Sequence, residues 1–455
     1  MYNPFIFKLE SGNSDILDQS QENDIITSST INLPLSSLGF HTYLHRTKSG
    51  LSITSNLQTK NRFYYVVNPF EEEIANYEDS LINLTKHYLN IKNDSPEIFS
   101  RAFYKMWEIL YIFNIADKKE LTYASIAEGP GPFIQAVILF REKLGQGVLN
   151  DKIFSVQVHS EKGKYLEMGK QFLGFYDKKF PGLINIHDTV SKTKSNTKKY
   201  KGKSSGDITD VKTISLFKKD IEKTKQYADL ITADGEFEWD DNNFQEQEGY
   251  KLILGEIITA LNVQSKDGNF ILKIFESFTI PTIKLLYILS SFYNETYIYK
   301  PYYSRPSESE RYVICKGFKY DQKKDSALLN KRIESLQNVI EKMNTLRFVY
   351  DIYPDLQVSQ SFINMIRFIN IKIANQQQII INEIIKYIKE NNYFGDKYHT
   401  FRDKQIDATK WWVGNFFPPS KNLYDKNKED TKKMIESSIH KYNIEQEKFS
   451  NQLIF

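Results

Sequence analysis

The sequence has little of several features that would place a protein in a class at once. It contains one cysteine, Cys315, in 455 residues, which excludes an internal disulfide and any zinc site built from several cysteines. The formal net charge is only +3, so a nucleic-acid site would have to come from a local cluster of charge. No stretch approaches the ~20 uncharged apolar residues that cross a bilayer, and the N-terminus does not read as a signal peptide. We expect a cytoplasmic type of protein with no membrane partner.

Two common nucleotide-binding motifs are also missing. The sequence has no GxGxxG fingerprint of a dinucleotide-binding fold and no GK[ST] motif of a P-loop. What it does have is a length beyond the usual single domain, with 40% hydrophobic and 26% charged residues, the composition of a soluble globular protein. One α/β domain with flanking additions is therefore the expected organisation.

The middle of the chain alternates short apolar runs with helical periodicity. The runs fall at residues 125–128, 153–158, 183–186, 228–234, 268–276, 296–303 and 311–318. This order predicts an α/β fold with a seven-stranded, doubly wound Rossmann-like sheet whose last two strands form an antiparallel pair. We predict three parts: an N-terminal extension or small domain at 1–94, the sheet domain at 95–320, and a mainly helical C-terminal region at 321–455.

The C-terminal region is predicted to be helical over residues 326–346 and 363–389. Residues 411–419 form an aromatic cluster in a turn-like setting. These aromatic rings could stack on a base, but buried packing is the favoured interpretation.

Four charged residues stand at suggestive places in this pattern. Asp234 ends a buried strand, Lys273 interrupts an apolar strand, Glu310 leads the last strand, and Lys105 lies on a predicted helix at residues 98–113. Parallel strands carry their ligands at the carboxyl edge of the sheet. We therefore expect these side chains to share a site, although Lys105 alone would read as a solvated helix lysine.

A glycine-rich turn separates the first strand from its helix. Glu128, Gly129, Pro130 and Gly131 form this turn, where glycines let the backbone approach a ligand. A turn of this kind can also simply join a strand to a helix. Residues 191–205 carry six lysines and no acid, a pattern typical of either a solvated loop or an RNA contact.

His41 and His45 are four residues apart and could share a helix face as metal ligands. The sequence offers no evident third ligand, so packing or surface roles are favoured and no metal site is predicted.

Six motifs in order resemble the FtsJ-like ribose 2′-O-methyltransferases. They are SRAFYK at 100–105, IAEGPG at 126–131, GDITD at 206–210, LITADG at 230–235, LKIF at 272–275 and SRPSESERY at 304–312. The last motif is similar to that of the cap-specific branch of eukaryotes and large DNA viruses. The resemblance covers about residues 95–320 and departs from the family at Pro132, where a second glycine is usual, and at Gln157, where an acidic residue often follows the second strand.

The resemblance implies a catalytic tetrad of Lys105, Asp234, Lys273 and Glu310, with Glu308 a weaker competitor for the last place. It implies S-adenosylmethionine as cofactor, bound along Glu128, Gly129, Pro130 and Gly131 and beside Asp234, with Asp207 facing the adenine. The implied partner is RNA, namely the 5′ end of capped mRNA, together with other capping or transcription proteins. Viral factories, virions or the nucleus are alternative locations to the cytoplasm. Two rival functions stay open: 2′-O-methylation inside ribosomal or transfer RNA, and an inactive RNA-binding subunit.

The chemistry sets a condition on Lys273. A lysine can accept the proton of a ribose hydroxyl only if its pKa falls from about 10.4 towards neutrality. Burial and a second cation, here Lys105, would lower it, whereas nearby carboxylates would raise it. We expect Lys273 to be the base, Asp234 to orient its amine, and Glu310 with Lys105 to fix the hydroxyl.

Overall fold

The computed structural model describes most of the chain. The described residues are 4–19, 24–34, 38–56, 63–74, 77–158, 168–187, 204–236, 241, 243–343 and 348–452. The lysine-rich residues 191–203 lie outside these ranges.

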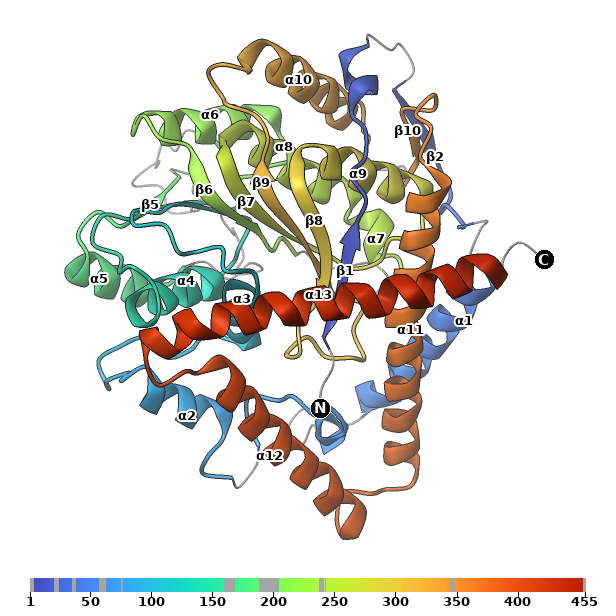
Figure 1. Ribbon diagram of the computed structural model, residues 1–455. Helices are drawn as coiled ribbons and strands as arrows, with labels where there is room; N and C mark the ends of the chain where they lie inside the picture. Colours follow the sequence, from blue (N-terminus) through green and yellow to red (C-terminus); the bar gives the residue numbers. More distant parts are fainter. Residues whose placement is uncertain are drawn as a thin grey trace, which may run out of the picture.

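The central sheet has eight strands within the described ranges, in the order β1-β8-β9-β7-β6-β3-β4-β5 (Figure 1). They are β1 (Phe5–Leu9), β3 (Thr122–Ile126), β4 (Lys152–Val156), β5 (Ile184–Ile186), β6 (Ala228–Ala233), β7 (Gln264–Ile274), β8 (Tyr293–Lys300) and β9 (Arg311–Phe318). Strands β3 to β7 pair in parallel, and β9 is antiparallel to both β7 and β8. The predicted doubly wound sheet and its antiparallel closing pair are confirmed. The eighth strand, β1, comes from the N-terminal region and pairs with β8.

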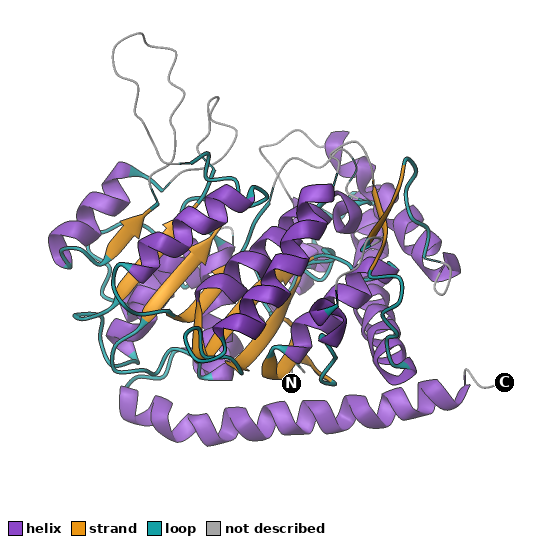
Figure 2. Cartoon of the chain, turned by 90° about the horizontal axis from the view of Figure 1, so that it is seen from above, coloured by secondary structure: helices purple, strands orange, loops and turns teal. Residues whose placement is uncertain are grey.

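Helices cover both faces of the sheet, as Figures 1 and 2 show. One face packs against α6 (Val211–Glu222), α8 (Tyr250–Val263) and α9 (Ile280–Ser291), and the other against α3 (Arg101–Phe113), α4 (Pro132–Lys143) and α5 (Lys170–Lys179). Because both faces are buried, the central strands are continuous apolar runs rather than alternating ones. A buried cysteine, Cys315, lies in β9 as part of this core.

The flanking regions pack around this domain. They contain α1 (Leu38–Ser49), α2 (Leu81–Tyr88), α10 (Ser326–Lys342), α11 (Gln360–Lys389), α12 (Asp396–Phe416) and α13 (Lys421–Gln452), with 3-10 turns at Asp15–Asp18, Gly50–Asn56 and Phe63–Val67. A small sheet pairs β2 (Ile25–Ser28) with β10 (Phe348–Ile352), and the short α7 (Gln245–Glu248) precedes α8. In Figures 1 and 2, α13 is a long straight helix along one side of the molecule. None of the described helices combines the length and apolarity that a bilayer crossing requires.

The predicted C-terminal helices are confirmed as α10 and α11. The turn-like setting predicted for residues 411–419 is wrong, because Trp411 to Phe416 form the last turns of α12. Trp412 is fully buried, as the packing interpretation requires. Its indole N–H donates to the Glu108 carboxylate at 2.8 Å, and this buried bond ties α12 to α3.

Candidate active site

The register of the parallel strands places the predicted site residues at one edge of the sheet. Ile126 at the end of β3 pairs with Ala233 at the end of β6, and Ala233 pairs with Leu272 of β7. The residues that follow therefore emerge side by side. The chain winds from β3 towards β4 on one side and reaches β6 on the other, so the edge between β3 and β6 is the switch point where doubly wound sheets bind ligands.

Two buried ion pairs join the four residues of the predicted tetrad. Lys105 of α3 places its Nζ 2.7 Å from the carboxylate of Glu310, which immediately precedes β9. Lys273 of β7 places its Nζ 2.9 Å from Oδ1 of Asp234, which follows β6. The charges of one pair act on the acid of the other, since Lys273 lowers the pKa of Glu310 and Glu310 raises that of Asp234. The structure therefore brings together four side chains that lie far apart in the sequence.

The charges around Lys273 differ from the sequence-based expectation. Burial lowers the pKa of Lys273, but the carboxylates of Asp234, Glu236 and Glu310 outweigh burial and raise it above its ordinary value. Lys105, the second cation of the site, is itself paired with Glu310 at 2.7 Å. Lys273 is therefore a charged, paired lysine in this structure.

The other acid of the tetrad is held ionised. Burial raises the pKa of Glu310, but Lys105, Lys273 and Lys300 act in the opposite direction and lower it to about 2. A carboxylate in this state can accept a hydrogen bond from a substrate hydroxyl but does not donate a proton to it.

Glu236 is a member of this site that sequence reasoning missed. Its side chain is largely exposed, and its Oε2 lies 3.4 Å from Lys273 Nζ. It stands two residues past Asp234, but an exposed acid in a loop gives no signal of its own in the sequence.

Replacement of Glu236 by glutamine is expected to lower the pKa of Lys273, because it removes one of the carboxylates that raise it. If Lys273 acts as a base, the acidic limb of the pH profile for methyl transfer shifts to lower pH. Glu334→Gln, on an exposed face of α10, serves as the matched control and leaves the profile in place. If the acidic limb of the pH profile does not move in Glu236→Gln, then Glu236 does not raise the pKa of Lys273.

The loop between β8 and β9 carries Glu310 and is shaped by a second buried lysine. Lys300 donates to Ser304 Oγ at 3.1 Å and to the carbonyl oxygens of Glu308 and Glu310 at 2.8 Å each. Burial lowers the pKa of Lys300 to about 7. Its bonds fold the loop so that the Glu310 side chain meets Lys105, whereas Glu308 pairs with Arg305 at 3.4 Å.

The C-terminal helix α11 braces the same loop. Gln377 donates to the carbonyl oxygen of Ser307 at 3.0 Å. Asn370 accepts from Arg311 at 2.9 Å and donates to the carbonyl oxygen of Ser277 at 2.8 Å. Helix α11 thus holds the segments that follow Lys273 and that flank Glu310.

The N-terminal region contributes a carboxylate that joins α3 to this loop. Glu71 is buried and pairs with Arg305 at 2.9 Å and with Arg101 at the start of α3. The Arg305 guanidinium also lies 3.9 Å from the centre of the Tyr65 ring. Arg101 stands one helical turn before Lys105, so Glu71 fixes the spacing between the two elements that provide Lys105 and Glu310.

Replacement of Glu71 by alanine is expected to lower kcat by about 10-fold, because small displacements of positioned groups are costly. The binding of S-adenosylmethionine should change little, since Glu128 and not Glu71 makes the side-chain hydrogen bonds that hold the glycine-rich turn. Glu71→Gln, which keeps a hydrogen-bond acceptor, should recover part of the loss, and the exposed Glu73→Ala is the control. An unchanged kcat in Glu71→Ala would show that Glu71 does not position the site.

The glycine-rich turn after β3 has the geometry of a ligand cradle. Gly131 has φ +98°, and a Cβ there would lie 3.2 Å from Met168, so only glycine fits without strain. It caps α4, which begins at Pro132, and the first N–H groups of that helix, those of Phe133 and Ile134, donate to Glu128. The turn can therefore meet a cofactor only through its own backbone, and Pro132 replaces the glycine that is usual in the family.

Glu128 turns into the protein rather than towards this cradle. It is fully buried and accepts hydrogen bonds from Ser125 Oγ at 2.6 Å, from Phe133 N and from Ile134 N at 3.3 Å. Burial raises its pKa to about 8. Its side chain anchors the turn to α4, which leaves the backbone of Gly129, Pro130 and Gly131 to approach a cofactor.

Two further residues shape the same edge. Asp207 is half-buried and accepts from Thr209 N at 2.9 Å and Thr209 Oγ1 at 2.8 Å, so its carboxylate stabilises its own turn. Gln157, at the end of β4, lies against the carbonyl oxygens of Glu128 and Gly129. It contacts the cofactor turn from the position where the family often has an acid.

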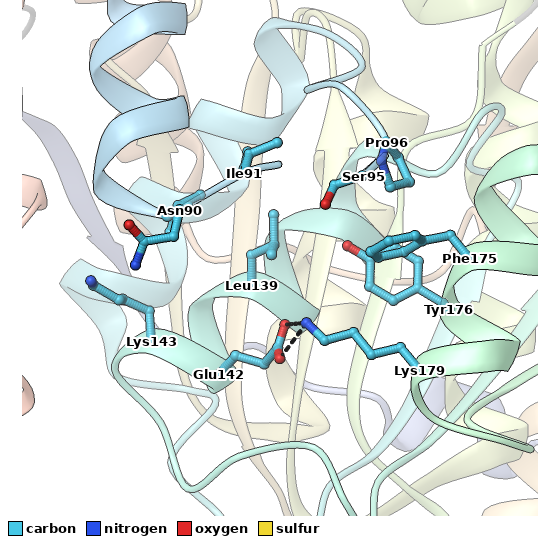
Figure 3. Close-up of a pocket in the computed structure, with 11 residues that line it drawn as sticks. Asn90, Ile91, Ser95, Pro96, Leu139, Glu142, Lys143, Phe175, Tyr176 and Lys179 are labelled. Carbon is cyan, nitrogen blue, oxygen red and sulfur yellow. Dashed lines mark hydrogen bonds and ion pairs between the residues drawn. The ribbon is translucent and has the colours of Figure 1, made fainter. Parts of the chain in front are cut away.

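A cavity of about 200 Å³ lies beside α4 and α5, on the face of the sheet that these helices cover (Figure 3). It is lined by residues of the α2–α3 connection, the last turns of α4, and α5, and an ion pair of 2.7 Å between Lys179 and Glu142 closes one side. Helix α4 begins at the glycine-rich turn and its last turns line this cavity. A helix of its length, 12 residues, is roughly 18 Å long. The cavity shares no residue with the tetrad and is separate from the candidate site.

Comparison with known proteins agrees with this geometry. Residues 98–318 match the family model of the FtsJ-like methyltransferases. The chain is 27% identical over 218 residues to cap-specific mRNA (nucleoside-2′-O-)-methyltransferase 1 of Caenorhabditis elegans, covering 47% of this chain and 23% of that protein. It is 31% identical over 176 residues to the human protein of that name, covering 36% and 21%.

An inactive cap-specific mRNA (nucleoside-2′-O-)-methyltransferase 1B of Caenorhabditis briggsae is 26% identical over 218 residues, covering 47% of this chain and 25% of that protein. The chain thus spans about a quarter of the length of these relatives. A solved structure assigned as a ribosomal RNA methyltransferase of Plasmodium falciparum has a TM-score of 0.33 and 17% identity, covering 48% of this chain and 97% of that chain. That likeness is too weak to support any inference.

The strand order, the antiparallel β9 and the glycine-rich turn at the switch point define the class of the fold, which is the Rossmann-like sheet of the methyltransferase type. Within that class, residues 98–318 form an FtsJ-like methyltransferase domain.

Proposed function

We propose that the protein transfers a methyl group from S-adenosylmethionine to the ribose 2′-hydroxyl of the first transcribed nucleotides of capped mRNA. The observation that carries the proposal is the pair of buried lysine–carboxylate contacts, Lys105 with Glu310 and Lys273 with Asp234, at the switch point of the sheet. The cap-specific relatives support the choice of substrate, since two of them act on capped mRNA by their names.

When bound, S-adenosylmethionine would supply a methyl group already activated on a sulfonium. The residues that would hold it are Gly129, Pro130 and Gly131 through their backbone, Asp234 near the positive charge, and Asp207 on the adenine side. The protein must then orient the ribose oxygen and remove its proton.

Lys273 is placed to take that proton, and Glu310 with Lys105 to hold the hydroxyl. Lys273 begins as an ammonium, because three carboxylates raise its pKa. It must therefore release its own proton to solvent before it can accept one from the ribose hydroxyl. Asp234, 2.9 Å away, orients the amine.

A comparison of capped and uncapped transcripts of one sequence tests the proposal. Methyl-labelled S-adenosylmethionine should label only the capped transcript, and nuclease mapping should place the label on the 2′-oxygen of the first nucleotides. Label inside uncapped ribosomal or transfer RNA would favour the rival substrate. Binding of RNA and cofactor without any transfer would favour an inactive subunit, such as the relative named as inactive.

A further inference from the structure

Three potential metal ligands meet where the N-terminal helix α1 contacts the end of β7. His41 and His45 are four residues apart on α1 and share one face of that helix. Glu276 follows two residues after β7. One ring nitrogen of each histidine and one carboxylate oxygen of Glu276 all lie within 4.8 Å of one another. Sequence reasoning left the two histidines without a third ligand, and the structure supplies one from a position 231 residues beyond His45.

His41 is buried without a polar partner. Only 4% of the residue is exposed, and no hydrogen bond of either ring nitrogen is found within the described ranges. Its ring packs against those of His45 at 3.8 Å and Phe278 at 5.0 Å between centroids, and one of its nitrogens lies within 4.8 Å of a Glu276 carboxylate oxygen. An imidazole without a hydrogen-bond partner in the protein keeps a ring nitrogen available as a ligand. A metal ion bound to one of its nitrogens would account for this position.

The two oxygens of Glu276 have different surroundings. Oε1 accepts from Lys48 Nζ at 3.0 Å and from Ser309 Oγ at 2.8 Å. Oε2 faces His45 Nε2 at 3.0 Å. Oε1 is thus saturated by protein donors, and Oε2 is the oxygen directed at the two histidines.

We propose that His41, His45 and Glu276 bind one divalent transition-metal ion, for which zinc is the best match to the donors. Two imidazole nitrogens and one carboxylate oxygen are a known zinc ligand set that leaves the fourth position to water. Metal–ligand distances of about 2.0–2.2 Å would place tetrahedral donors roughly 3.4 Å apart, so small side-chain rotations close the site around an ion.

The local charges set the expected strength of binding. Lys48 contacts Glu276 directly, and the buried Arg311 also lies close enough to interact with it. These cations oppose the arrival of a further positive charge. We therefore expect weaker binding than at a structural zinc site made of cysteines.

The position of the ion gives it a structural role near the active site. Glu276 lies three residues beyond Lys273, and Ser309, which bonds Glu276, directly precedes Glu310. An ion at this point would fasten α1 to the two segments that carry Lys273 and Glu310. Removal of the ion should weaken the packing of α1 before that of the central sheet.

The test uses the full chain, stripped with EDTA and dialysed. Titration with Zn²⁺ alone, followed by calorimetry and by metal analysis, should give one ion per chain and a higher Tm. His41→Ala should bind Zn²⁺ at least 10-fold more weakly and lose the rise in Tm. His399→Ala, which removes an exposed histidine of α12, should behave as the wild type.

A second readout covers the case in which His41→Ala does not fold. Co²⁺ added to the stripped wild type should produce the visible absorption bands of a four- or five-coordinate site, and Zn²⁺ should displace it at one equivalent. Absence of these bands, or of stoichiometric Zn²⁺ in the wild type, would overturn the proposal. Equal Zn²⁺ affinity in folded His41→Ala would also overturn it, because the ion would then be adventitious.

Discussion

Lys273→Ala is expected to reduce methyl transfer to capped RNA by about 10³-fold, within the range of 10² to 10⁴ that general bases contribute. Lys273 Nζ lies in the centre of the site, 2.9 Å from Asp234 and under the influence of Glu310. Binding of S-adenosylmethionine should remain measurable, since the glycine-rich turn does not depend on Lys273. Transfer by purified enzyme and cofactor binding by calorimetry provide the two measurements.

Lys273→Arg separates the two roles that this lysine could have. Arginine keeps a positive charge opposite Asp234, but it does not lose its proton in proteins. If Lys273 removes the ribose proton, Lys273→Arg should be almost as inactive as the alanine variant. Recovery of activity in the arginine variant would show that the charge alone is required. Lys266→Ala, at an exposed position of the same strand, is the control.

The pH dependence of the wild type follows from the same charges. The pKa of Lys273 is raised by Asp234, Glu236 and Glu310, so the ammonium form dominates at neutral pH. Because only the neutral amine can act as a base, the rate should rise with pH through the neutral and alkaline range. A rate that is independent of pH in this range would contradict the assignment of Lys273 as base.

The sheet could be predicted from the sequence because its strands are buried on both faces. Runs such as residues 228–234 are continuous in apolar residues, and the register of parallel strands then places Asp234 beside Lys273 at one edge. The roles of Lys105 and Glu310 were implied by the resemblance of their motifs to the family. The structure places all four side chains together, as the strand register and the resemblance predict.

The supports of the site could not be predicted, because they depend on contacts between distant segments. Glu71 and Glu276 have no periodic or motif signal, and each has a partner far along the chain: Arg305 lies 234 residues from Glu71, and Lys48 lies 228 residues from Glu276. The pairing of Lys105 with Glu310 likewise spans 205 residues. For this reason the sequence could not show whether burial and Lys105 or the nearby carboxylates prevail in setting the pKa of Lys273. The aromatic cluster at 411–419 was taken for a turn because its proline pair at 418–419 ends the helix just after the aromatic residues.

Removing one partner of the Lys105–Glu310 pair is expected to destabilise the protein strongly. Both side chains are buried, with Nζ 2.7 Å from the carboxylate. Breaking a buried pair typically costs about 3–5 kcal/mol, because a buried charge is left without its partner. Glu310 keeps Lys273 and Lys300 nearby, so Lys105→Met should fall at the lower end of that range, measured by urea unfolding.

Replacing both partners should separate stability from catalysis. In Lys105→Met/Glu310→Leu no charge of the pair is left unmatched, so much of the lost stability should return. Methyl transfer should not return, because the groups that would hold the ribose hydroxyl are gone. Full activity in Lys105→Met/Glu310→Leu would show that this pair has no role in methyl transfer. Unchanged stability in Lys105→Met would show that the pair is exposed to solvent.

Acid titration gives an independent measure of the same pair. The pKa of Glu310 is lowered from 4.5 to about 2 in the folded protein. A lowered carboxyl pKa contributes stability that is present above the unfolded pKa and is lost as the pH falls through the folded one. The wild type should therefore lose stability between about pH 4.5 and pH 2, and Glu310→Gln should lack this part of the slope. If the two proteins lose stability in parallel over this window, then Lys105 does not hold Glu310 in its ionised form.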